Sequence, residues 1–189
     1  METIKVIDNF YSDPLKVRET VINNQDIWNT WGNWPGIRSG KVSLEESKIL
    51  KDYFERNVTH SPILDWNVGA NTTFQATYYW DDTWIHHDNC DYAAVLFLTP
   101  DAPLKAGTSF YRSRFTNKIF WEKGDPIIND QTTPDDSNWE LVMEVGNIFN
   151  RLIVYDARCF HRSNLPGFGD NLQNCRLTQV FFWNMEMVW

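Results

Sequence analysis

The segment 83–99, TWIHHDNCDYAAVLFLT, places two histidines and two aspartates immediately before an apolar stretch. Side chains at positions i and i+2 of an extended segment point the same way, so His86 and Asp88 can reach one point while His87 faces outward to solvent. Starting from His87 would instead place Asn89 at i+2, a poorer anionic ligand. An imidazole and a carboxylate at this spacing indicate part of a metal site.

A third protein ligand is expected from another strand, because two seldom make a catalytic metal site. The chain has four histidines, and His161 follows the apolar stretch RLIVYDA. His60, close before Pro62, is interpreted as a loop residue. Two imidazoles and one carboxylate on one face of an octahedron leave the other face open, which suits non-haem Fe(II). Each histidine taken alone is more simply a hydrogen-bonded structural residue, whereas the set of three favours iron.

An arginine also begins an apolar stretch, CRLTQVFFWN, with no carboxylate near it in sequence. A buried guanidinium without a partner is costly, and its planar fork fits a carboxylate in a bidentate manner. We therefore expect Arg176 to anchor an acidic co-substrate, with Thr178 on the same strand face adding a hydroxyl. The alternatives are an ion pair with a structural acid for Arg176 and ordinary strand packing for Thr178. Gln75 and Tyr79 face either a ligand or the core.

Taken in order, four segments resemble the 2-oxoglutarate, Fe(II)-dependent oxygenase superfamily over roughly residues 70–185: HHD (86–88), AGTSFYR (106–112), NRLIVYDARCFHRS (150–163) and RLTQVFFW (176–183). The N-terminal VIDNFYSDPLKVRETV and the WPGIRSG loop further resemble a branch of small oxygenases within it. The resemblance implies a double-stranded β-helix in which His86, Asp88 and His161 bind Fe(II) and Arg176 binds the 5-carboxylate of 2-oxoglutarate.

The same resemblance implies a dioxygenase that uses O2 and releases succinate and CO2 while oxidising an unidentified substrate. Asp88 favours hydroxylation, since related halogenases need this carboxylate replaced. Arg176 lies fifteen positions after His161, a longer separation than is usual in the superfamily. Either the intervening LPGFGDNLQN adds to a loop, or another residue is the anchor.

The elements that must position these residues are helices followed by strands. Segments 13–24 and 43–58 have helical spacing, the second with a capping-box pattern at Ser43 and Glu46. Strands are expected in TIKVI, TTFQATYYW, DYAAVLFLT, TSFYRSR, WELVMEV, RLIVYDA and CRLTQVFFWN. In WELVMEV, apolar residues at every second position predict a half-buried strand. Segments 28–40 and 124–138 are expected to be loops, the first irregular and the second on the surface.

Helices first and many short strands afterwards predict a mainly β fold with flanking helices, a jelly roll of the cupin-like, double-stranded β-helix type. We expect a single domain over 1–189, with helical N-terminal support over about 1–60 and the jelly-roll core over about 70–185. Two rival functions remain. One is a closed zinc site of two histidines with Cys90 and Cys159, and the other is a binding or structural module without turnover.

The net charge and the apolar content of the chain limit the partners and the location that we expect. The net charge of −8 makes nucleic acid and anionic membranes poor partners, and leaves a small molecule or a protein as the substrate. No apolar stretch is long enough to span a membrane, and the first ten residues lack a signal-peptide core, so a cytoplasmic location is expected. The three cysteines are expected to be reduced thiols.

Overall fold

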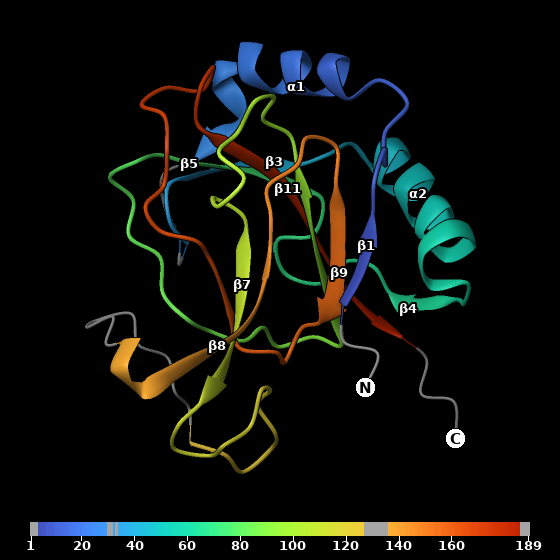
Figure 1. Ribbon diagram of the computed structural model, residues 1–189. Helices are drawn as coiled ribbons and strands as arrows, with labels where there is room; N and C mark the ends of the chain where they lie inside the picture. Colours follow the sequence, from blue (N-terminus) through green and yellow to red (C-terminus); the bar gives the residue numbers. More distant parts are fainter. Residues whose placement is uncertain (1–3, 30–31, 33, 127–135, 186–189) are drawn as a thin grey trace.

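Two antiparallel sheets make up the protein, whose computed structural model describes residues 4–29, 32, 34–126 and 136–185 (Figure 1). The larger sheet has eight strands, in the order β1 (Ile4–Ile7), β9 (Leu152–Asp156), β6 (Tyr92–Phe97), β11 (Arg176–Met185), β5 (Thr73–Thr77), β3 (Ile37–Lys41) and β2 (Trp28–Asn29), with β4 (Ile63–Asp65) paired to β11. The smaller sheet has the order β10 (His161–Ser163), β7 (Thr108–Ser113) and β8 (Trp139–Val145). The predicted mainly β, jelly-roll fold with flanking helices is confirmed.

Two helices begin where their capping residues predict. Helix α1 (Pro14–Asn23) has proline in its first turn, and the side chain of Asp13 accepts a hydrogen bond from Lys16 N. Helix α2 (Leu44–Tyr53) starts with both hydrogen bonds of the capping box between Ser43 and Glu46. It continues into one stretch of π-helix (Phe54–Thr59), and two short 3-10 helices cover Gln25–Ile27 and Asp136–Asn138.

Strand β11 shows how the larger sheet separates two environments. Its outward residues Leu177, Phe181 and Trp183 are fully buried against the helices and the segment that follows them. Phe54 contacts this face directly, with its ring centroid 4.8 Å from that of Phe181. The inward residues of β11 are Arg176, Thr178, Val180 and Phe182, and all four line a cavity. The period-two pattern therefore puts the aromatic core on one face and a partly polar cavity on the other.

Two local predictions were wrong. Segment 28–40 is not wholly an irregular loop, because β2 and the first residues of β3 lie within it and pair with each other. Together with β1, these strands make the N-terminal support part of the larger sheet rather than helical alone. In β8, Trp139 and Val145 are buried as predicted, but Leu141 and Met143 are 55% and 38% exposed.

The reason for the exposure lies in the position of β8. It is an edge strand of the smaller sheet, and its register against β7 shifts between Phe110 and Tyr111. Such an irregularity changes which face a side chain points to, so strict alternation does not survive along the strand. Most of the predicted surface loop 124–138 falls in 127–135, outside the described residues. No helix among the described residues is long and apolar enough to cross a membrane.

Candidate metal centre and its cavity

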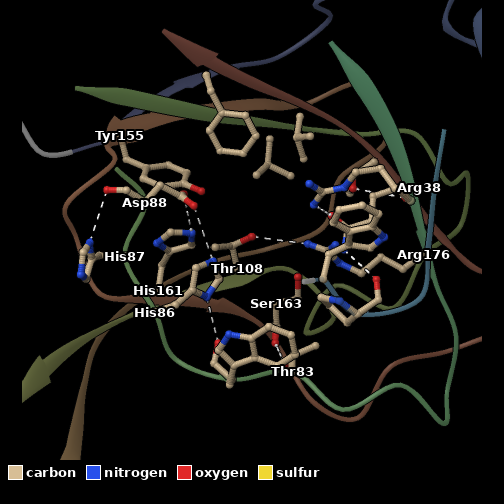
Figure 2. Close-up of a pocket in the computed structure, with 18 of the residues that line it drawn as sticks. Arg38, Thr83, His86, His87, Asp88, Thr108, Tyr155, His161, Ser163 and Arg176 are labelled. Carbon is tan, nitrogen blue, oxygen red and sulfur yellow. Dashed lines mark hydrogen bonds and ion pairs between the residues drawn. The ribbon is translucent and has the colours of Figure 1, made fainter. Parts of the chain in front are cut away.

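A cavity of about 290 Å³ lies between the two sheets, and its wall includes the predicted metal ligands His86, Asp88 and His161 together with Arg176 and Thr178. Figure 2 shows His86, Asp88 and His161 together on one side of it, and Arg38 and Arg176 on the other. Strands β3, β5, β6, β9 and β11 of the larger sheet and β7 and β10 of the smaller one contribute to the wall. Segments far apart in the sequence thus meet around one space.

The two histidines and the aspartate form a compact cluster. His86 and His161 are joined by reciprocal backbone hydrogen bonds of 3.0 and 2.8 Å, which hold the 83–88 segment alongside β10. His161 Nε2 lies 3.5 Å from one carboxylate oxygen of Asp88, and His86 Nε2 lies 4.0 Å from the other. One ligand atom from each residue falls within 4.8 Å of the other two. Ligand atoms that share one ion at ~2 Å lie roughly 3 to 4 Å apart, so the two nitrogen–oxygen distances already match a metal site and the whole cluster is close to that size.

The Nδ1 atoms of His86 and His161 make contacts that determine which ring nitrogen is available to a metal ion. His86 Nδ1 faces the carbonyl oxygen of Trp84 at 3.0 Å, and His161 Nδ1 faces that of Cys159 at 2.8 Å. A carbonyl oxygen only accepts, so each Nδ1 carries the proton and each Nε2 of a neutral ring presents a lone pair. The Nε2 atoms of both rings and the carboxylate of Asp88 therefore converge as possible metal ligands.

Burial supports the neutral form of His161. It lowers the pKa of this imidazole from 6.5 to about 4, aided by nearby His86 and opposed by Asp88. At neutral pH the contact between His161 and Asp88 is consequently no ion pair. Tyr155, on β9, packs its ring 4.8 Å from that of His161 and also lines the cavity. Burial raises the pKa of its phenol well above the ordinary value, so it stays protonated.

Arg176 is 3% exposed and contacts no carboxylate among the described residues. Its Nε donates to Ala106 O at 3.2 Å, and one terminal nitrogen, Nη2, donates to Gly107 O at 3.3 Å. Burial lowers the pKa of the guanidinium to about 10, which leaves it charged at neutral pH. The expected alternative of a structural ion pair is therefore absent from the part of the chain that the structure describes.

The long separation between His161 and Arg176 is taken up by a loop. Residues 164–175 form a loop of bends with a turn at 172–174, and Arg18 from α1 holds this loop by donating to Leu172 O and Gln173 O. Thr178 is 1% exposed, lines the cavity and directs its hydroxyl to Gln75 O at 3.4 Å.

The structure also places the remaining residues that the sequence analysis singled out. Gln75 lines the cavity, whereas Tyr79 is 62% exposed and lies outside it. His87 is not a free surface residue, because its ring stacks on Trp121 with centroids 4.9 Å apart and planes 9° apart. No cysteine belongs to the cluster among the described residues, and Cys90 and Cys159 pack instead in an apolar group behind it. Because neither thiol lies with the two histidines in this cluster, the zinc alternative has no support.

Sequence reasoning missed Arg38. It lines the cavity from β3, and the segment that carries it was assigned to a loop. Gly36 holds the preceding turn against β5 at a φ of +71°, where a Cβ would lie 2.1 Å from Ala76 O. Ile37 is the only apolar residue in IRSGK, so no alternating pattern indicated a strand there. Tyr155 was likewise overlooked, because a tyrosine in an apolar strand is ordinarily a core residue.

Comparison with known families gives one match, to a family described as "Family of unknown function (DUF6445)", over residues 73–183. The match covers more than half of the chain. The chain belongs to this family. No curated protein matches it.

Solved structures give the fold. A prolyl hydroxylase from Trichoplax adhaerens, in complex with a hypoxia inducible factor oxygen degradation domain peptide fragment, is similar with a TM-score of 0.59 and 13% identity, over 97% of this chain and 84% of that one. HygX from Streptomyces hygroscopicus, with nickel, 2-oxoglutarate and hygromycin B bound, gives 0.63 and 11%, over 98% and 84%. A Pseudomonas putida prolyl-4-hydroxylase gives 0.51 and 10%, over 97% and 93%. The chain therefore has the fold of 2-oxoglutarate, Fe(II)-dependent oxygenases.

Proposed function

We propose that the protein is a non-haem Fe(II), 2-oxoglutarate-dependent dioxygenase that hydroxylates an organic substrate. The observation that carries the proposal is the convergence of three acceptor atoms, from His86, Asp88 and His161, inside a cavity that also holds an unpaired arginine. Acceptors arranged in this way repel one another unless a cation lies between them. Two imidazoles with one carboxylate are the donor set that suits Fe(II) and leaves coordination positions open.

The chain's own groups define the rest of the site. The carbonyls of Trp84 and Cys159 fix the ring orientation and tautomer of the two histidines, so that both Nε2 atoms are ready to bind metal. Arg176 holds the distal carboxylate of 2-oxoglutarate. Its second terminal nitrogen, Nη1, has no acceptor among the described residues, so it is free to donate to that carboxylate. Thr178 adds a hydroxyl on the same face.

With Fe(II) held by His86, Asp88 and His161 and 2-oxoglutarate held by Arg176, the site would supply oxidising chemistry in which one atom of O2 enters a substrate C–H bond, the other enters succinate, and CO2 is released. The retained carboxylate of Asp88 favours hydroxylation over halogenation. The walls formed by Val95, Val180 and Phe182 limit access of water to the reacting groups.

Titration of the protein with Fe(II) and 2-oxoglutarate under anaerobic conditions tests this function. We expect His161→Ala to weaken iron binding by more than about 100-fold, because one of three ligands is lost. Arg176→Gln is expected to retain iron and to weaken 2-oxoglutarate binding roughly 10- to 100-fold, the value of a charge-assisted hydrogen bond. Succinate release with Fe(II) and O2 reports turnover.

Two matched variants serve as controls. His60→Asn changes a histidine outside the cavity while tolerating its positive φ, and Arg18→Gln removes another buried guanidinium that is bonded to backbone carbonyls. Both should bind iron and 2-oxoglutarate like the wild type. Equal iron occupancy in the wild type and His161→Ala would disprove the metal site, and a wild type that binds neither iron nor 2-oxoglutarate would favour a binding module.

A further inference from the structure

A second arginine, Arg38, faces the same cavity and has no ion-pair partner among the described residues, although Asp88 acts on its charge at longer range. The guanidinium of Arg38 lies over the ring of Trp34, with 4.8 Å between its carbon and the ring centroid. Its Nη2 donates to the neutral amide oxygen of Gln75 at 2.5 Å. Its Nε is buried and has no acceptor among the residues that the structure describes. In the described part of the chain, no carboxylate lies within ion-pair distance of this cation.

Apart from Arg176, the other buried or half-buried arginines of the described residues are satisfied in recognisable ways. Arg162 makes two hydrogen bonds of 2.7 Å to the carboxylate of Asp136, and Arg151 is similarly paired with Asp8. Arg18 donates to backbone carbonyls. Arg38 therefore stands apart, because its planar fork is oriented by an aromatic ring and one neutral amide, and its charge is left for a ligand.

The position of Arg38 follows from strand register. Arg38 on β3 pairs with Gln75 on β5, which pairs with Thr178 on β11, so the three lie in one row across the larger sheet. Figure 2 shows Arg38 near Arg176, across the cavity from the histidines and Asp88. Arg38 comes from β3, close to the edge of the sheet, where Trp34 and Pro35 also line the cavity.

The formal charges at the site indicate that Arg38 and Arg176 bind different ligands. In the proposed holoenzyme, the double charge of Fe(II) and the charge of Arg176 cancel those of Asp88 and of dianionic 2-oxoglutarate. Asp88 is the one carboxylate in the described wall of the cavity. The charge of Arg38 then remains uncompensated in a partly desolvated space, where an unpaired cation is costly.

We propose that Arg38, with Trp34 and Gln75, binds a carboxylate of the primary substrate, which is therefore a small organic acid. This inference rests on the proposed oxygenase function. A carboxylate matches the fork of the guanidinium, and the ring of Trp34 keeps that fork in place while it is empty. The side chains of Trp84, Val180 and Phe182 offer apolar contacts to the carbon skeleton of the acid.

Ligand-observed NMR on protein loaded with Zn(II) and saturating 2-oxoglutarate tests the inference, since zinc is diamagnetic and prevents turnover. The probes are hexanoate and benzoate, compared with hexanamide and benzamide. We expect the wild type to bind at least one acid saturably and its amide at least tenfold more weakly. Arg38→Gln should weaken acid binding by about tenfold or more, and Arg38→Lys by less, because it keeps the charge without the fork.

Lys41→Gln is the matched control, since it removes a cation from the same strand outside this cavity. It should bind the acids like the wild type, and all three variants should bind 2-oxoglutarate within twofold of the wild type. Loss of 2-oxoglutarate in Arg38→Gln as large as in Arg176→Gln would overturn the inference, since Arg38 would then hold the co-substrate. Equal binding of acids and amides, no binding of either acid, or binding of phenyl phosphate in place of benzoate would overturn it too.

These outcomes are separable from failure of the proposed function. Each sample is first titrated with Zn(II) and 2-oxoglutarate. A wild type that binds neither overturns both proposals, whereas normal loading with acid binding that does not depend on Arg38 overturns only the assignment of the substrate.

Discussion

The two faces of the larger sheet are built from the same strands, but one is a packed aromatic core and the other lines a cavity. On the outer face, Phe54, Phe181 and Trp183 are fully buried, with ring centroids about 5 Å apart, which is the geometry of a well-packed aromatic core. On the inner face, neighbouring residues of β11 leave a cavity lined by charged and polar groups. Packing stabilises the first face, and the second retains unpaired donors and acceptors that only a ligand would satisfy. Adjacent residues of β11 therefore have different roles, because one contributes to the stability of the core and the next lines the candidate site.

The largest expected effect compares two adjacent phenylalanines. Phe181→Ala should lower the free energy of unfolding by about 3 to 5 kcal/mol, because it opens a void among tightly packed rings. Phe182→Ala should cost no more than about 2 kcal/mol, since it only enlarges an existing cavity. Urea unfolding of both variants measures the difference. Equal losses would show that the inner face is as important for stability as the outer one.

Lowering the pH should destabilise the protein through His161, which lines the cavity from β10 of the smaller sheet. Burial lowers the pKa of its imidazole from 6.5 to about 4, so between these values the unfolded chain binds a proton that the native state does not. The stability of the metal-free protein should therefore rise with pH across this range and fall as the pH drops from 6.5 towards 4, by at most about 1.4 kcal/mol per pH unit from this group. Urea midpoints measured with chelator between pH 7.5 and 4.5 report it. His161→Gln should flatten the dependence, and an unchanged slope would contradict the assignment.

The smallest effect concerns helix α2, which covers the outer face. Ser43→Ala removes the hydroxyl that accepts from Glu46 N and should cost about 1 kcal/mol of stability. Iron and 2-oxoglutarate binding should stay at wild-type values, because the cap lies outside the cavity. Thermal unfolding combined with the metal titration checks both halves. A loss of metal affinity with the cap would show that the two faces are coupled.

Several features were predictable from short-range patterns. The two helix starts depend on capping residues within four positions, and the alternation along β11 follows from the two-residue period of a strand. The pairing of His86 with Asp88 in one segment also needed only local spacing. β8 was the exception, because a register shift against its neighbour decided which of its side chains are exposed.

The tertiary structure determines which residues line the cavity. His161 meets Asp88 through a bridge between segments 75 residues apart, shown by the backbone hydrogen bonds of His86 with His161. Arg38 reaches the cavity because β3 pairs with β5, a contact that no local pattern predicts. The sequence alone thus determined the periodicities, the helix caps and the candidate ligands. Only the long-range register of paired strands decided which of these groups face one another, since hydrogen bonding across a sheet depends on partners that are distant along the chain.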